Sequence, residues 1–109
     1  MLGLLETLLD ENVLIFEEDL KKIDTLLRDY PDLITDIIKV HSFAKDNEDV
    51  IIAEYIYPTE DNKLIYELGT FGVEEAVRLS MAIDMLGIRS KNLIVSIAYP
   101  KEDIEDEGD

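Results

Sequence analysis

The stretch that sets the expected fold covers residues 50–70 and reads VIIAEYIYPTEDNKLIYELGT. Its two halves, Val50–Tyr57 and Lys63–Thr70, are rich in Ile, Val and Tyr, which favour strands. The connector between them, Pro58–Asn62, consists of turn-forming residues at the length of a hairpin loop. The stretch therefore predicts two antiparallel strands joined by a short turn.

A third strand is expected directly before this hairpin. Asp36–Ala44 is rich in Ile, Val and Phe, and the polar connector Lys45–Asp49 separates it from Val50. The three segments together predict an antiparallel meander. In the strand Val50–Tyr57 both faces carry apolar or aromatic residues, which makes both faces of the sheet candidates for burial.

Helical patterns flank the predicted meander. Glu17–Tyr30 places Leu20, Ile23 and Leu27 on one helix face, and Pro31 is expected to end that helix. A wide apolar face predicts a largely buried helix over Val73–Leu86, with Gly87 as its C-terminal cap. Three further elements complete the expected list: a short helix over Leu4–Leu9, a short strand or a bend over Val13–Phe16, and a fourth strand over Asn92–Tyr99.

These elements predict one two-layer α+β domain in the order α-βββ-α-β, with one or two N-terminal helices, a three-stranded antiparallel meander, a helix and a fourth strand. The domain is expected to cover residues 1–100. The remaining residues, 101–109, include six acids and are expected to form a disordered acidic tail.

Charge is the dominant feature of the composition. The chain has 26 Asp and Glu against 10 Lys and Arg, a formal net charge of −16 on 109 residues. Small soluble domains usually carry a net charge of magnitude about 2–8. A surface this acidic repels nucleic-acid phosphates and anionic lipids, so neither direct nucleic-acid binding nor membrane binding is expected.

Other compositional features narrow the class of protein. Cysteine is absent, which excludes disulfides and thiolate metal sites. No apolar run reaches the roughly 18–20 residues that span a bilayer, and the N-terminus lacks the basic region of a secretory signal. A cytoplasmic location is therefore expected. The dense charge and the scarcity of amide side chains also point toward heat-adapted proteins.

Three features of the sequence are candidates for a site of chemistry. His41, the single histidine, could act as a general base only beside a nucleophile or an acid, and its neighbour Ser42 would point to the other face of a strand. Asp46–Asp49 lacks the spacing of a calcium loop. Gly69–Gly72 precedes a helix that opens with two glutamates, which would repel a phosphate. No catalytic residue, cofactor or metal is predicted, and the chain is not expected to be an enzyme.

One segment resembles known sequences. Leu79–Ile97 forms a helix, then Gly87-Ile88, then a strand, and is similar to a segment of several small archaeal virus proteins. The resemblance covers about a fifth of the chain and implies no functional residue.

The acidic surface remains as the candidate functional feature. The predicted function is a non-catalytic interaction module, most concretely a viral or mobile-element inhibitor whose carboxylates face a basic, nucleic-acid-binding protein. A small oligomeric structural subunit or chaperone-like adaptor is a second hypothesis, and a carboxylate-based enzyme is a third. A homodimer is also expected, because it would bury a leftover sheet face or strand edge. The candidate protein-binding residues are Glu17, Glu18, Asp24, Asp29, Asp32 and Asp36.

Overall fold

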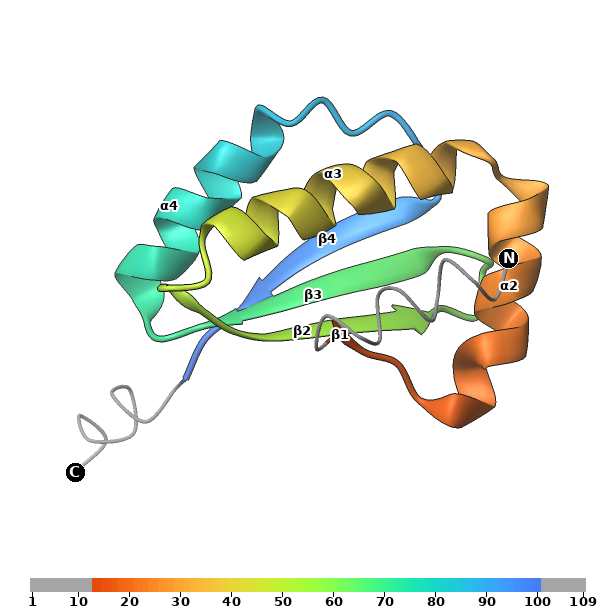
Figure 1. Cartoon of the computed structure of the whole chain (residues 1–109), viewed down its shortest axis with the longest axis horizontal. Coiled ribbons are helices and arrows are strands. Elements are labelled where there is room, and N and C mark those ends of the chain that lie inside the picture. The colour runs from red at the N-terminus through yellow and green to blue at the C-terminus, as the bar shows by residue number, and fades with distance from the viewer. Residues whose placement is uncertain (1–12, 101–109) are drawn as a thin grey trace.

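The computed structural model describes residues 13–100, which form three α-helices, one short 3-10 helix and a four-stranded sheet (Figure 1). In chain order the elements are β1 (Val13–Leu14), η1 (Glu17–Asp19), α2 (Leu20–Asp29), α3 (Asp32–Asp46), β2 (Ile51–Pro58), β3 (Leu64–Thr70), α4 (Val73–Asp84) and β4 (Leu93–Ala98). The helix expected over Leu4–Leu9 and the tail expected over 101–109 lie outside the described residues.

The hairpin predicted from residues 50–70 is confirmed, since β2 and β3 pair antiparallel from Ile51–Thr70 to Pro58–Leu64. Its turn closes with a bond of 2.8 Å from the Thr59 backbone N–H to the Lys63 carbonyl. Asn62 takes a positive φ of 65° in this turn, a conformation that asparagine tolerates better than most residues. Local sequence therefore determines this part of the fold.

The prediction of a fully antiparallel sheet is wrong. The strand order is β1-β2-β3-β4, and both outer pairs, β1 with β2 and β3 with β4, are parallel. A parallel neighbour requires a crossover connection. Here α2 and α3 connect β1 to β2, and α4 connects β3 to β4 (Figure 1).

The strand predicted over Asp36–Ala44 is also wrong, because this segment lies inside helix α3. The buried apolar residues of α3 are Leu33, Ile37, Val40 and Ala44, which are spaced as the residues on one face of a helix are. Pro31 stands at the N-cap of α3, so it separates α2 from a second helix and not from a strand. The polar connector at residues 45–49 therefore links a helix to β2 and is not a hairpin turn.

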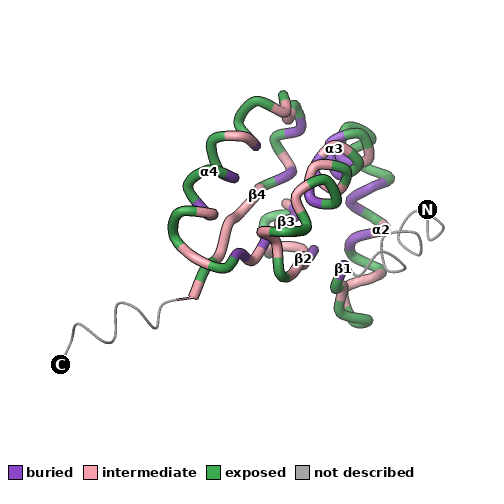
Figure 2. Tube along the Cα trace, turned by 60° about the vertical axis from the view of Figure 1, so that its left-hand side comes forward, coloured by how far each residue is buried: buried purple, intermediate pink, exposed green. Residues whose placement is uncertain are grey.

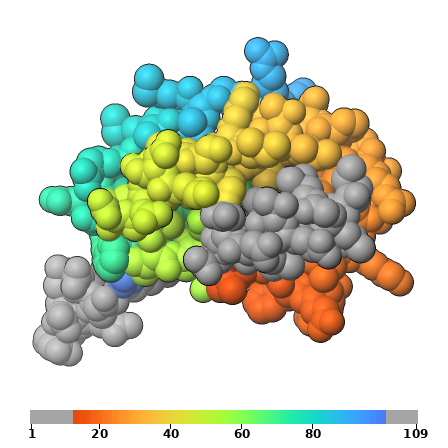
Figure 3. All heavy atoms as spheres, viewed as in Figure 1, coloured from red at the N-terminus to blue at the C-terminus, as the bar shows by residue number. Residues whose placement is uncertain are grey.

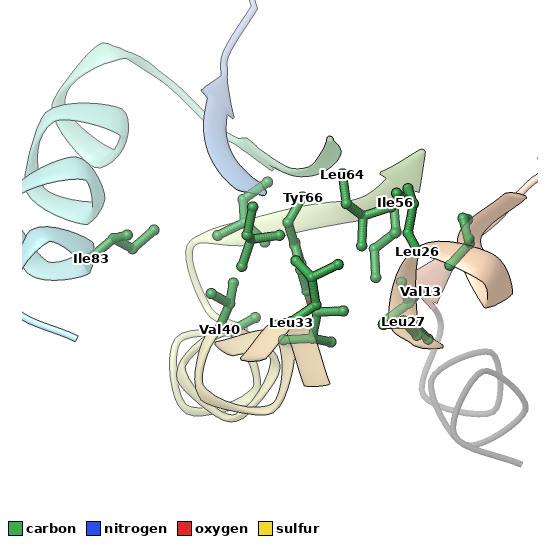
Figure 4. Packing of buried hydrophobic residues seen from close by; sticks show 14 residues of the cluster. Val13, Leu26, Leu27, Leu33, Val40, Ile56, Leu64, Tyr66 and Ile83 are labelled. Carbon is green, nitrogen blue, oxygen red and sulfur yellow. The ribbon is translucent and has the colours of Figure 1, made fainter. Parts of the chain in front are cut away.

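The helices pack on one face of the sheet. Along β3, Leu64, Tyr66, Leu68 and Thr70 are fully buried, whereas the residues between them are only half-buried. Val40 of α3 and Ile83 of α4 belong to the same core as Leu64 and Tyr66, so both helices cover this face (Figures 2 and 4). The described part of the molecule is thus a two-layer α+β domain. Within it, no helix is both long and apolar enough to cross a bilayer.

Candidate protein-interaction surface

Glu17 and Glu18 are exposed on η1, at one end of the molecule. η1 begins shortly after β1, whose last residue, Leu14, pairs with Tyr55 of β2. Figure 3 shows the η1 and α2 segments along the lower right-hand edge of the molecule, in red-orange and orange.

The β2–β3 turn adds two more carboxylates to this end. The Lys22 ammonium of α2 donates a hydrogen bond of 2.7 Å to the Thr59 carbonyl, so the turn lies against α2. Glu60 and Asp61 are exposed in the turn. The Thr59 hydroxyl donates to Asp61 and lowers the pKa of that carboxyl. We call Glu17, Glu18, Glu60 and Asp61 the acidic corner; none of the four forms an ion pair with another described residue.

The other predicted site residues on α2 and at the start of α3 are in different surroundings. Asp24 accepts an ion pair of 3.0 Å from Arg28, one turn further along α2. Asp29 and Asp32 line a pocket of about 400 Å³, in which Arg89 and Lys91 supply positive charge. Asp24 therefore has an ion-pair partner, and Asp29 and Asp32 share their pocket with two cations. In the acidic corner, Lys22 and Lys63 lie close enough to Asp61 to contribute to the lowering of its pKa.

Asp36 does not lie on an acidic surface, because it is 1% exposed. Its Oδ2 accepts hydrogen bonds from the backbone N–H groups of Arg89 (3.1 Å) and Ser90 (2.6 Å). Lys39, one turn along α3, lies 3.9 Å from the other carboxylate oxygen and donates a bond of 3.1 Å to the Gly87 carbonyl. Asp36 thus holds the loop between α4 and β4 against α3, and it is not available to a partner.

A second group of acids lies at the opposite end of the molecule. Asp46 is the last residue of α3, Glu48 and Asp49 follow it, and Glu74 and Glu75 stand in the first turn of α4. A pocket of about 170 Å³ between the two helices is lined by residues of both, so these helix ends are neighbours (Figure 1). Among the described residues, no group of three or more His, Cys, Asp or Glu side chains could hold a metal ion.

His41 has a carboxylate and a phenol beside it, contacts that sequence neighbours did not indicate. Its Nδ1 lies 3.3 Å from Glu54 Oε1 and 3.3 Å from the Tyr66 hydroxyl, which itself donates a bond of 2.5 Å to Glu54. The side chains of His41 and Glu54 are each 12% exposed. Burial raises the pKa of the Tyr66 phenol, and the bond to Glu54 raises it further.

This polar cluster joins α3 to strands β2 and β3. The buried Nε2 of His41 has no hydrogen-bond partner among the described residues. Ser42 is exposed on the adjacent position of α3, so it supplies no nucleophile to the cluster. The bond from Tyr66 satisfies the Glu54 carboxylate inside the domain. The expectation that His41 lies on a strand without an acid beside it is wrong, since His41 is in α3 and Glu54 of β2 lies next to it.

Comparison with protein-family models, curated proteins and solved structures gives no match to this chain.

Proposed function

We propose that this protein is a non-catalytic interaction module that places its acidic corner on a basic protein surface. The observation that carries the proposal is the position of four exposed carboxylates from two separate elements, η1 and the β2–β3 turn, without an ion-pair partner among the described residues. Unpaired charges on a fixed scaffold give an oriented negative field, which steers a positively charged partner into place.

The negative charge of the acidic corner indicates the chemistry of the partner surface. Carboxylates held at the end of a sheet can occupy a groove of Lys and Arg side chains that otherwise holds nucleic-acid phosphates. The most concrete form of the proposal is a viral or mobile-element inhibitor of a nucleic-acid-binding protein. The chain itself then binds a protein and has no contact with nucleic acid.

The first test measures salt dependence and competition. The full-length chain is immobilised, and binding proteins are captured from cell lysate at about 0.05 and about 0.5 M salt, where screening differs strongly. A captured basic protein should be released by the higher salt and by duplex DNA or RNA. A partner that binds equally well at both salt concentrations, and that nucleic acid does not displace, would show the proposal to be wrong.

The second test locates the binding surface with two matched sets of charge reversals. Glu17, Glu18 and Glu60 are changed to Lys in one chain, and Asp46, Glu48 and Asp49 in the other, so that both gain the same net charge. Rim charges act mainly on the association rate. We expect the first set to slow association with the captured partner about tenfold or more and the second about twofold. Equal effects of the two sets would mean that net charge matters and the acidic corner does not.

A further inference from the structure

The outer side of α4 carries a stripe of exposed apolar side chains. Val73, Val77, Met81 and Met85 follow one another at intervals of four residues and are between 51% and 86% exposed. Residues at this interval lie on one side of a helix. The opposite side of α4 is already used, since it buries Leu79 and Ile83. α4 therefore has a second apolar side that the described fold leaves uncovered.

This stripe borders a groove at the edge of the sheet. The groove has a volume of about 390 Å³, with Val73, Val77 and Met81 of α4 along its wall and Val95, Ile97 and Tyr99 along its floor. A different pocket, lined by Phe43 of α3 and by Glu75 and Arg78 of α4, lies between the two helices. The two pockets share no residue, so the stripe borders β4 and not α3. Figure 2 shows α3 and α4 apart from each other.

The floor of the groove belongs to an edge strand. β4 is last in the sheet order, and β3 is its only partner among the described strands. The outward-facing backbone groups of such a strand are a template for pairing with another chain. Charged residues make up 33% of the sequence, yet none of the eight residues that line the groove is charged. A continuous uncharged apolar surface of this kind marks a contact site.

We propose that a second copy of this chain covers this groove, in a twofold-symmetric dimer that pairs the two β4 strands antiparallel and packs the two α4 stripes together. The stripe forms a ridge and the groove lies beside it. In a twofold contact the ridge of each copy can therefore fit the groove of the other. At a net charge of −16, two copies repel each other unless the contact is made by uncharged residues. The eight residues that line the groove meet that condition, and the charged neighbours of the stripe on α4, Glu74 and Asp84, lie outside the groove.

The exposed apolar area is a large part of what each partner of a stable dimer buries. Val73, Val77, Met81, Met85 and Tyr99 together expose on the order of 600 Å². Each partner of a stable protein complex buries about 800 Å², and the edge of β4 supplies additional surface. The contact also lies away from the acidic corner, which belongs to the other end of the molecule, so a dimer would present two acidic corners.

Mass measurement on the full-length chain tests the proposal. Light scattering at high micromolar concentration should give twice the chain mass of 12.5 kDa. Val77→Glu places a charge in the contact twice because of the symmetry, and it should raise the dimer dissociation constant at least about 100-fold. Two exposed residues serve as controls with similar exposure: Ile38→Glu on α3 (49%) and Ile52→Glu on the uncovered sheet face (52%), compared with Val77 (53%). Both controls should remain dimeric.

Cross-linking tests the same contact without weakening it. The chain has no cysteine, so one introduced thiol reacts alone. Ser80→Cys lies in the groove near the middle of the stripe, whereas Ser42→Cys is exposed on α3 and is the matched control. A short bismaleimide should convert Ser80→Cys to a covalent dimer at low micromolar concentration and leave Ser42→Cys mostly monomeric.

Three results would overturn the proposal. A wild-type chain that keeps a mass near 12.5 kDa at high micromolar concentration would leave the groove to another occupant, either a segment of the same chain or a different protein. A folded Val77→Glu chain that dimerises like the wild type would exclude this surface. Loss of the dimer in Ile52→Glu, with Val77→Glu unaffected, would move the contact to the open sheet face.

Discussion

At the level of single residues, the buried polar groups explain how distant segments are joined. Asp36 binds the backbone of Arg89 and Ser90 across more than 50 positions, and Tyr66 binds Glu54 across the β2–β3 hairpin. Each contact satisfies groups that would otherwise be buried without a partner. The sequence predicted that Asp36 lies on the surface, as most acids do. Its burial could not be predicted, because its backbone partners, Arg89 and Ser90, are distant in the sequence.

Replacing Asp36 tests its role in holding the α4–β4 loop. Asp36→Ala leaves the N–H groups of Arg89 and Ser90 without their acceptor, and we expect it to lower the free energy of unfolding by about 2–4 kcal/mol. Asp32→Ala removes an exposed carboxylate from the same helix and should change the free energy of unfolding by about 0.5 kcal/mol or less. Urea unfolding measures both. Equal effects would contradict the buried role of Asp36.

Tyr66 predicts a pH dependence at alkaline pH. Its folded-state pKa is raised above the ordinary value of 10.0, so the folded protein holds the phenol proton more tightly than the unfolded chain does. The resulting stabilisation is fully present below pH 10 and is lost as pH rises above it. Chemical denaturation of the wild type should therefore show falling stability above that pH.

The Tyr66→Phe chain separates this effect from general alkaline unfolding. It lacks the ionisable phenol and the donor to Glu54, so it should be less stable by about 1–3 kcal/mol at neutral pH. Its stability should then fall less steeply than that of the wild type above pH 10. Tyr30→Phe, at an exposed position that follows α2, is the control and should keep the wild-type profile. Parallel profiles for Tyr66→Phe and the wild type would show that Tyr66 does not cause the loss.

At the level of elements, local signals predicted the hairpin, α4 and β4 to within two residues at each end. α3 was predicted as a strand because its β-branched residues favour strands, and that preference is weak compared with packing. The buried positions Leu33, Ile37, Val40 and Ala44 do carry a helical period. Pro31 followed by Asp32 is also typical of a helix start. The parallel strand pairs depend on contacts between distant segments and have no local signal.

The burial of α4 gives a prediction at this scale. Ile83 is 7% exposed and packs into the core that α3 and α4 share, so Ile83→Asp places an unpaired charge among apolar side chains. We expect this chain to lose about 4 kcal/mol or more and to be largely unfolded at room temperature. Ile38→Asp, on the exposed side of α3, should melt close to the wild type. Circular dichroism melts compare the two, and a cooperative wild-type-like melt of Ile83→Asp would contradict the packing of α4.

For the whole molecule, the fold distributes charge unevenly. Acids gather at the η1 and β2–β3 end and again where α3 ends and α4 begins, whereas the groove between α4 and β4 has none. Of the six residues predicted for partner binding, Glu17 and Glu18 lie in the acidic corner with turn residues from the hairpin. Asp24, Asp29 and Asp32 have cations nearby, and Asp36 is buried. Composition predicted that the surface is acidic. Contacts between distant segments, such as the bond from Lys22 of α2 to Thr59 of the β2–β3 turn, determine which acids lie near one another.

The net charge of −16 also makes a prediction about stability and salt. Mutual repulsion among acids opposes the compact state, and salt screens charges that lie more than about 8–10 Å apart at moderate ionic strength. Exposed ion pairs such as Glu75–Arg78 are weakened by the same screening, but each contributes only about 0–1 kcal/mol. Repulsion is therefore the larger effect, and the melting temperature should rise as salt increases from about 0.02 to about 0.5 M.

A chain without residues 102–109 tests this account, because the deletion removes six acids and no base and so brings the formal net charge to −10. Its melting temperature at low salt should be higher than that of the full chain, and its rise with salt should be smaller. Both chains carry Val77→Glu, so that salt-dependent dimerisation does not contribute, and sucrose at equal osmolality controls for solute effects other than screening. A melting temperature that falls with salt would contradict this account, because it would mean that favourable ion pairs contribute more to stability than repulsion among the acids removes.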